Sequence, residues 1–498
     1  MACTSHIDLV ITAAMADELP TAWLDEIGHP PLHFRALKGL AQSSIPSRLP
    51  DHGVLLLVTG VGLDASAAAA RWIQEHVAPT FVLNLGSAGR IDGSLPLHTW
   101  LTPREICDEE GNRLALDSRI PIPFVHTDRR FVAALCSVRR PVRNGDGHPI
   151  APMVDMEALA QARHFAPSDI AFTTLKMVTD DADGCVDADF AARLPAVRER
   201  IRRLLAFLEP VSHLPITVVI PVRDRADHIE ACLDSVLTQT EPADEVIVVD
   251  DASRDETVQR VRTFGEAVRL LRLPTHRGVS AARNVGIEAA SSPWIALLDS
   301  DDRWRPDKLA AQRRFVRRYP HYQILQSEEI WIRRGQRVNR HKHHAKPHGW
   351  VWRPSLGRCL ISPSAVLMHT DLIAECGGFD ENLPVCEDYD LWLRVSRWHP
   401  VGLDRTPSLM KYSGHADQLS TRLHAMDRFR VYAMLKALRH EQEGGHRQAL
   451  LAVLEEKLRI LAAGSEKRGL MVSALGYRQL WQQALAGEVQ LEDEWMLR

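Results

Sequence analysis

Apolar segments alternate with helical patterns through the first two hundred residues of the chain. Strand-like apolar runs occupy residues 7–14, 52–62, 80–89 and 170–183, and stretches with helical spacing occupy residues 64–76, 156–165 and 190–208. Short apolar runs separated by helical stretches are typical of successive βαβ units. This part of the chain is therefore predicted to form an α/β domain with a largely parallel sheet.

A second alternating series begins after residues 209–215, which contain two prolines and are predicted to be a linker. The series consists of strand-like runs at 216–222, 244–253 and 293–302 and helical runs at 228–239 and 277–290. From about Met426 the pattern becomes helical and charged. We therefore expect two Rossmann-like α/β domains, at residues 1–209 and 210–425, followed by a helical C-terminal extension at 426–498.

Composition narrows the function classes that fit the chain. Its 498 residues are too many for one ordinary domain, and its formal net charge of -4 gives no basic field for nucleic acid. No apolar run approaches the roughly 18 residues that span a bilayer. Asp8 interrupts the apolar start IDLVITAAMA, which is predicted to be a buried strand and not a signal peptide. With its scattered cysteines, the chain is expected to be cytoplasmic, without a nucleic-acid partner or transmembrane segment.

Acidic residues follow two predicted strands of the second domain. Asp250 and Asp251 end one strand, and Asp299, Asp301 and Asp302 end another. Ligands of open α/β sheets bind beyond the carboxyl ends of the strands, and neighbouring carboxylates that repel one another favour a bound cation. The alternative is that these aspartates cap helices or lie in solvated loops.

Six motifs follow one another in the second domain: VVIPVRDRADHIEACLDSVLTQT, EVIVVDDASRDET, GVSAARNVGIEAA, WIALLDSDDRWRPDKL, GGFDE and CEDYDLWLR. In this order and spacing they resemble the family-2 glycosyltransferases of the GT-A fold, over about residues 214–420. The resemblance implies an inverting, metal-dependent transfer of a sugar from a nucleotide-diphosphate donor to an acceptor that the sequence does not name.

The same resemblance implies roles for single residues. The nucleotide pocket would be lined by Pro221, Asp224, Asp250 or Asp251, and Arg283. Asp299 and Asp301 would hold Mn²⁺ or Mg²⁺ on the diphosphate, and His415 would contact the metal or the diphosphate. Asp388, expected in a loop before a helix, would be the general base.

The chemistry of sugar transfer requires these residue types. A metal ion neutralises the charge that grows on the leaving diphosphate, and a carboxylate takes the proton of the acceptor hydroxyl. For Glu387 and Asp388, the alternative role is to cap the helix that begins there. Residues 332–350 are dense in Arg, Lys and His and either bind an anionic acceptor or the diphosphate, or form a solvated loop.

The first domain contains an unusual acidic helix. Residues 153–162, MVDMEALAQA, are predicted to be a helix with Asp155 and Glu157 beside a small apolar face. A buried glutamate is costly unless it binds something, and a bidentate grip on two ribose hydroxyls would account for it, with Met156 against the sugar. The alternative is a surface acid beside a core methionine.

Five motifs of this domain, ITAAMADELPTAW, LVTGVGLDASAAAARW, LNLGSAGRID, VDMEALA and MVTDDAD, lie within residues 6–208. They resemble the purine nucleoside phosphorylase and nucleosidase superfamily, most closely the hydrolases similar to methylthioadenosine/S-adenosylhomocysteine nucleosidase. The resemblance implies hydrolysis of a purine-type nucleoside and a possible homodimer. It assigns water activation to Glu18, ribose binding to Met156 and Glu157, proton donation to N7 of the base to Asp180, and the nucleophile pocket to Ser87 and Gly60.

Hydrolysis is favoured over phosphorolysis because Asn84 stands where phosphorylases of this group place an arginine ahead of the GS-x-G turn. The chain is therefore expected to be bifunctional, with a glycosyltransferase and a nucleosidase domain. The alternative is a glycosyltransferase whose first domain is a non-catalytic nucleoside-binding or dimerisation module.

Overall fold

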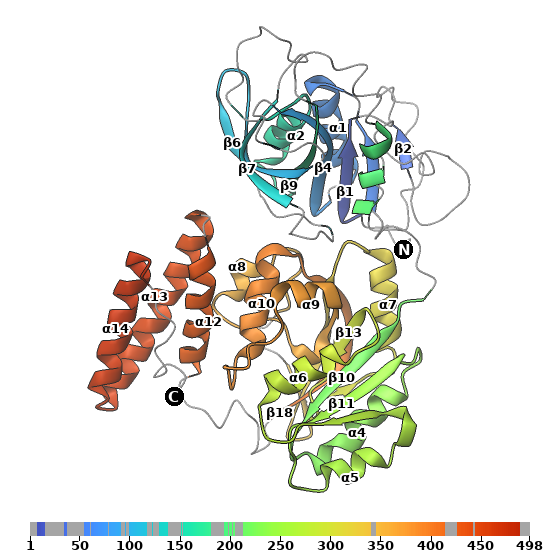
Figure 1. Cartoon of the computed structure of the whole chain (residues 1–498), viewed down its shortest axis with the longest axis vertical. Helices are drawn as coiled ribbons and strands as arrows, with labels where there is room; N and C mark the ends of the chain where they lie inside the picture. Colours follow the sequence, from blue (N-terminus) through green and yellow to red (C-terminus); the bar gives the residue numbers. More distant parts are fainter. Residues whose placement is uncertain are drawn as a thin grey trace. The chain divides into compact units, whose positions relative to one another are not determined.

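The computed structural model of the chain forms two compact units (Figure 1). Unit 1 comprises Met1–Ser212 and Phe315–Tyr322, and unit 2 comprises His213–Arg314 and Gln323–Arg498. The structure describes residues 7–14, 34–36, 54–59, 61–77, 79–90, 95, 99–116, 122, 129–137, 151, 153–180, 194–197, 199–201, 203–204, 213–339, 345–413, 426–441 and 444–488.

Unit 1 is built on a mixed sheet. Its strands are β1 (Leu9–Ala13), β2 (Phe34–Ala36), β3 (Val54–Val58), β4 (Phe81–Arg90), β5 (Trp100–Cys107), β6 (Arg113–Ala115), β7 (Arg129–Ser137), β8 (Met153–Asp155) and β9 (Ala171–Asp180). They follow the order β2-β3-β1-β4-β8-β7-β5-β6, and β9 pairs with both β4 and β5. The strands β4, β8, β7, β5 and β9 therefore close into a ring.

Two helices pack together against this sheet, α1 (Leu63–His76) and α2 (Ala158–Phe165). Buried side chains of both helices, among them Ile73 and Leu159, share one core with Val10, Leu101 and Leu135 of the strands. The alternation of strands and helices in the sequence thus corresponds to an apolar layer between helices and sheet, and the predicted α/β class is confirmed.

The predicted helix over residues 153–162 is wrong in its first part. Met153 and Val154 extend along β4, with Val154 opposite Gly89, and Asp155 lies opposite Ser137 of β7. This pairing with two strands outweighs the local helical spacing. The helix α2 begins only at Ala158, whose N–H donates to Asp155 Oδ2 at 3.0 Å.

Unit 2 contains a second mixed sheet. Its strands are β10 (Ile216–Val222), β11 (Glu245–Asp250), β12 (Arg269–Arg272), β13 (Trp294–Leu297), β14 (Arg303–Trp304), β15 (Ile324–Arg333), β16 (Gln336–Val338), β17 (Val366–His369) and β18 (Gly402–Ser413). The order is β12-β11-β10-β13-β17-β15-β18-β14, with β16 paired to β15. The strands β10 to β13 are parallel to one another, and β17 runs antiparallel to β13.

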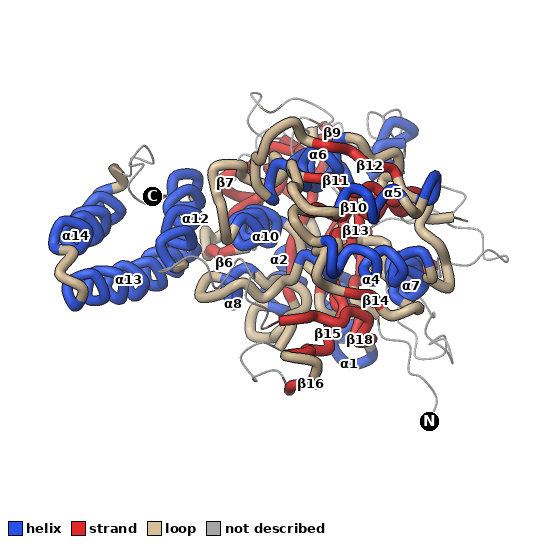
Figure 2. Tube along the Cα trace, turned by 90° about the horizontal axis from the view of Figure 1, so that it is seen from below, coloured by secondary structure: helices blue, strands red, loops and turns tan. Residues whose placement is uncertain are grey.

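The helices of unit 2 fall into two groups. Those between the strands are α4 (Ala226–Leu237), α5 (Thr257–Arg262), α6 (Val279–Glu288), α7 (Lys308–Arg318, which belongs to unit 2 as far as Arg314), α8 (Trp352–Ser355), α9 (Thr370–Cys376) and α10 (Glu387–Trp398). The C-terminal helices α12 (Asp427–His440), α13 (Gly444–Lys467) and α14 (Met471–Ala486) lie side by side at one edge of unit 2 (Figure 2). Among the described residues, no helix combines the length and apolarity needed to cross a bilayer.

Candidate active sites

The parallel strands of unit 2 bring their carboxyl ends to one edge of the sheet, as expected for a ligand site. Pro221 lies near the end of β10 and is buried. Just beyond β10, Asp224 has a left-handed backbone with φ of 50°. Asp224 Oδ1 accepts the N–H of Arg254 at 2.7 Å, and this bond joins the loops that follow β10 and β11.

The carboxylates of Asp250 and Asp251 are both occupied by protein contacts. Asp250 is fully buried and accepts from Arg272 Nε at 3.3 Å. Asp251 accepts the N–H groups of Arg277 and Gly278 at 2.7 and 2.9 Å. Asp251 therefore fixes the turn from which α6 begins, and a nucleotide role for either aspartate stays a prediction.

Arg283, on α6, connects two elements that carry predicted catalytic residues. Its guanidinium is 3% exposed and binds Asp299 Oδ1 at 2.7 Å and Glu387 Oε1 at 2.6 Å. Phe379 stacks against the same group, with its ring centroid 5.0 Å away. Because Glu387 precedes Asp388, Arg283 ties the aspartates after β13 to the first turn of α10.

Glu387 and Asp388 both lie inside α10, so the expectation of a loop at Asp388 is wrong. Cys386 adopts a left-handed backbone with φ of 61°, and the helix begins directly after it. Burial raises the pKa of Glu387 to about 7, although Arg283 opposes the shift. Asp388 is partly exposed, and Cys359 Sγ lies 3.4 Å from its Oδ2.

Asp299, Asp301 and Asp302 are crowded after β13. Asp302 is buried and accepts the N–H of Tyr412 at 2.9 Å. Burial raises the pKa of Asp302 well above its ordinary value, and the charge of Asp301 adds to this. Asp299 and Asp301 are less buried, and their oxygens are the donors that a hard divalent ion prefers, so these residues fit the predicted Mn²⁺ or Mg²⁺.

The third predicted metal contact, His415, lies outside the described residues. Within the part of the chain that the structure describes, there is no group of three or more His, Cys, Asp or Glu residues arranged to hold a metal. The predicted metal site therefore consists of Asp299 and Asp301, with the remaining ligands to come from the diphosphate and water.

A half-buried lysine that no sequence motif predicted stands close to the acidic residues. Lys411, on β18, lies one residue before Tyr412, and its Nζ is 3.2 Å from Ser362 Oγ. Burial lowers the pKa of Lys411, but Glu329, Asp302, Asp299 and Asp388 outweigh burial and raise it. The only sequence signal is a lysine four residues before the predicted His415.

A second lysine, which is buried, balances Glu329. Lys346 Nζ lies 3.2 Å from Glu329 Oε2 and donates to Gln326 Oε1 at 3.0 Å. Burial would raise the pKa of Glu329, but Lys346 and Lys411 lower it to about 2. Glu329 therefore stays ionised, and of the two lysines Lys411 also interacts with Asp388, the predicted general base.

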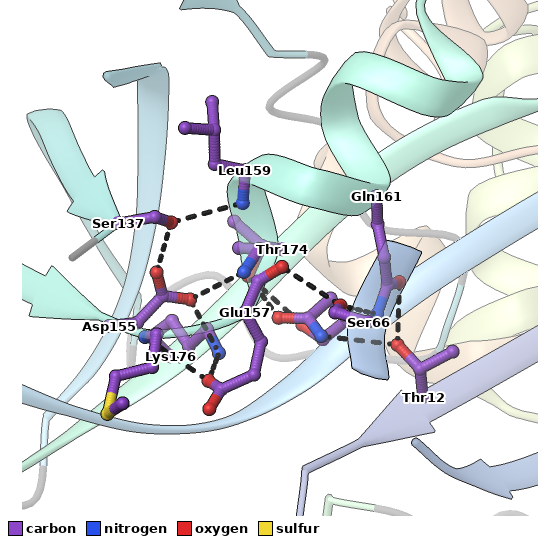
Figure 3. A network of polar contacts seen from close by, with 12 residues as sticks. Thr12, Ser66, Ser137, Asp155, Glu157, Leu159, Gln161, Thr174 and Lys176 are labelled. Atoms are coloured by element: carbon purple, nitrogen blue, oxygen red, sulfur yellow. Dashed lines mark hydrogen bonds and ion pairs between the residues drawn. The ribbon is translucent and has the colours of Figure 1, made fainter. Parts of the chain in front are cut away.

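The acids of unit 1 form a separate polar network (Figure 3). Lys176 of β9 is 1% exposed and lies 3.0 Å from Asp155 Oδ2 and 4.0 Å from Glu157 Oε2. Ser137 donates to the other oxygen of Asp155. Asp155 is therefore a structural residue, which caps α2 and neutralises Lys176.

Glu157 is held at the start of α2 with only 6% of its surface exposed, so it is not a surface acid. Its Oε1 accepts the N–H of Gly62 at 3.4 Å, and its carbonyl accepts from Ser66 at 2.9 Å. Gln161 links Ser66 to Thr12 of β1 through bonds of 2.9 and 3.0 Å. This chain of bonds connects the position of Glu157 to the centre of the sheet (Figure 3).

The register of β4 places other predicted residues at the same end of the sheet as Glu157. Ser87 pairs with Met177 of β9, and Gly89 pairs with both Val154 and Asp180. The backbone of Asp180 therefore lies at the same end of the sheet as Ser87, Met156 and Glu157. The side chain of Asp180 and the whole of Glu18 and Gly60 lie outside the described residues.

Comparison with known proteins finds relatives of one segment of unit 2. Residues 217–366 match the family model "Glycosyl transferase family 2", which confirms the resemblance stated for this segment. An uncharacterized glycosyltransferase of Rickettsia conorii is 27% identical over 224 residues, which are 43% of this chain. The match spans 36% of that relative, so the chain covers about a third of its length.

Two solved structures match parts of the chain at low sequence identity. A Staphylococcus aureus TarS fragment in complex with UDP-GlcNAc is 20% identical, covers 57% of this chain and 91% of its own, and gives a TM-score of 0.45. An S-adenosylhomocysteine nucleosidase of Streptococcus pyogenes is 16% identical, covers 41% of this chain and 96% of its own, and gives a TM-score of 0.31.

Proposed function

We propose that unit 2 is an inverting glycosyltransferase that moves a sugar from a nucleotide-diphosphate donor to an acceptor hydroxyl. The family match over residues 217–366 supports the class. The observation that carries the proposal is the bridge from Asp299 through Arg283 to Glu387, which joins one predicted metal residue to the neighbour in sequence of the predicted base.

In the proposed reaction, the acceptor oxygen attacks the anomeric carbon of the donor sugar. The new glycosidic C–O bond forms as the bond from that carbon to the diphosphate oxygen breaks, and the nucleoside diphosphate leaves. Asp388 takes the proton of the acceptor hydroxyl. A divalent ion held by Asp299 and Asp301 would neutralise the charge of the leaving group.

Donor turnover tests this proposal without knowledge of the acceptor. Purified full-length protein would be incubated with Mn²⁺ and a panel of nucleotide-sugars, and release of nucleoside diphosphate would be followed by chromatography. We expect release from at least one donor, and a loss of at least about a hundredfold in Asp388→Asn. Equal release by Asp388→Asn and the parent chain would contradict the assigned base.

For unit 1, we propose hydrolysis of the N-glycosidic bond of a purine-type nucleoside. The buried position of Glu157, 4.0 Å from Lys176 and at the same end of the sheet as Ser87 and the backbone of Asp180, supports a site for ribose hydroxyls. Water would add to the anomeric carbon as the bond to the base nitrogen breaks, Glu18 would take a proton from the water, and Asp180 would protonate N7 of the base.

Release of free base tests the second activity. The full-length protein would be given purine nucleosides, including 5′-modified ones, with and without phosphate. Release without phosphate that disappears in Glu18→Gln and Asp180→Asn would support hydrolysis. Binding of a nucleoside without any release would instead support the non-catalytic module.

A further inference from the structure

A cavity of about 580 Å³ lies between β15, β16 and β18 of unit 2. It forms where the register between β15 and β18 shifts twice, at Ser327, Glu328 and Glu329. Such irregularities bend a strand away from its partner and redirect side chains, and they occur often beside binding sites. The cavity belongs to neither the proposed metal residues nor the proposed nucleotide pocket.

The charged groups in its wall favour an anion. Arg337 and Arg405 line the cavity, and neither has an ion pair within the part of the chain that the structure describes. Glu329 also lines it, but Lys346 balances this carboxylate at 3.2 Å. Among the lining residues that the structure describes, Glu328 is the remaining acid, so the two arginines leave this part of the wall with a positive balance.

An aromatic side chain completes the wall. Trp331 lines the cavity, and its indole N–H donates to Glu329 Oε1 at 2.8 Å. This bond fixes the ring, which is only partly buried. An indole held in this way offers a flat apolar surface of the kind that packs against a sugar ring.

The cavity adjoins the acidic residues of the proposed transferase site. Trp331 lies directly opposite Lys411 in the pairing of β15 with β18. Lys411 contacts Ser362, and it interacts with Glu329 as well as with Asp299 and Asp388. A sugar in the cavity would therefore lie next to the group of residues that contains the proposed base.

We propose that this cavity is the acceptor subsite and that the acceptor is a sugar bearing a phosphate or carboxylate group. Arg337 and Arg405 bind the anionic group, and Trp331 packs against the ring. This inference rests on the proposed transferase function. Guanidinium groups bind both kinds of anion through paired N–H donors, so the shared chemistry is an anionic oxygen group.

Binding of simple sugars to the full-length protein tests the cavity directly. Glucose, glucuronic acid and glucose 6-phosphate would be titrated in turn, with affinity measured by ligand-observed NMR. We expect glucuronic acid or glucose 6-phosphate to bind and glucose to bind at least about tenfold more weakly. The anionic sugar that binds with the higher affinity shows whether the arginines select a phosphate or a carboxylate group.

Substitution of the lining arginines tests whether the sugar binds in this cavity. Arg337→Gln and Arg405→Gln should each weaken binding of the anionic sugar by about fivefold or more, whereas Arg333→Gln should leave the affinity unchanged. Arg333 is an exposed arginine on the same hairpin that does not line the cavity. Equal binding of glucose and both anionic sugars, or an equal loss in Arg333→Gln, would overturn the inference.

Donor hydrolysis by water separates this inference from the transferase proposal. Arg337→Gln and Arg405→Gln should hydrolyse the nucleotide-sugar within about twofold of the parent rate, because they lie outside the donor machinery. Absence of donor hydrolysis in the parent chain would count against the proposed transferase alone. A loss of donor hydrolysis in both arginine variants, with the parent active, would contradict the acceptor role of the cavity.

Discussion

At the scale of single residues, four carboxylates of unit 2 act on the ammonium group of one half-buried lysine. Glu329, Asp302, Asp299 and Asp388 together raise the pKa of Lys411 against the effect of burial. A fixed positive charge at this point reduces the repulsion among the acids. It also competes with any divalent ion that the same acids attract.

Replacing Lys411 by methionine should therefore strengthen Mn²⁺ binding. Removal of one nearby unit charge is worth about 1 to 3 kcal/mol at an effective dielectric near 20, so we expect roughly tenfold tighter binding by calorimetry. Lys308→Met is the control, because Lys308 is a buried lysine that donates to Gln312 and lies over Trp304. Unchanged or weaker Mn²⁺ binding in Lys411→Met would contradict this assignment.

The raised pKa of Glu387 predicts that the free energy of unfolding depends on pH. Its pKa is about 7 in the folded chain against an ordinary value of 4.5. The protonated form is thus favoured by folding, and the stability it contributes at low pH is lost as the pH rises through 7. Glu387→Gln cannot ionise, so its stability relative to the parent should rise between pH 5 and pH 8, by about 3 kcal/mol at most.

Thermal unfolding of the two proteins across that pH range measures this effect. Asp227→Asn, an acidic residue in the first turn of α4, serves as the control. A stability difference between Glu387→Gln and the parent that does not change with pH would show that Glu387 does not titrate there.

At the scale of elements, α6 positions Arg283 by lying very close to the sheet. A Cβ at Gly286, one turn after Arg283, would lie 2.4 Å from Val219 Cγ1 and 3.1 Å from Val249 Cγ2. Both valines belong to the central strands β10 and β11. Only glycine allows this approach, and it places Arg283 within reach of Asp299 and Glu387.

Gly286→Ala should push α6 away from β10 and β11. We expect a loss of about 1 to 3 kcal/mol in the free energy of unfolding, together with reduced donor turnover. Gly357→Ala is the control, since a Cβ there meets nothing within 4 Å. Equal stability of the two variants in denaturant titrations would show that the contact between α6 and the sheet is not limiting.

The elements also show what the sequence could predict. Strand β10 was predicted from its apolar run, and Asp299, Asp301 and Asp388 were predicted from motifs of local residues. Strand β8 was mistaken for helix because the extended conformation of its three residues is determined by pairing with β4 and β7. Lys411 and Glu329 were missed because the pairing of β18 with β15 brings together residues about eighty positions apart, which no local pattern records.

At the scale of the whole molecule, the C-terminal helices complete the core of unit 2. Phe429 and Leu435 of α12 and Leu454 of α13 are buried in one cluster with Trp352 of α8 and Tyr389 of α10. Tyr389 follows Asp388 directly, and its hydroxyl donates to the carbonyl of Leu356 at 2.6 Å. The packing of these helices therefore supports the turn that carries the proposed base.

Deletion of residues 426–498 should expose this apolar cluster. We expect the truncated chain to aggregate or to unfold at least about 10 °C below the parent, because several large side chains lose their burial. Size-exclusion chromatography and thermal unfolding measure both outcomes. A monodisperse truncated chain with the thermal stability of the parent would show that the helices are a dispensable attachment.

The most direct test of the central claim is donor turnover by the full-length protein in the presence of Mn²⁺. The parent chain would be compared with Asp388→Asn and with the double variant Asp299→Asn, Asp301→Asn. The account predicts that the parent releases nucleoside diphosphate from a nucleotide-sugar, that the double variant loses the dependence on Mn²⁺, and that Asp388→Asn is inactive. Turnover that is unaffected by both sets of substitutions would contradict the account.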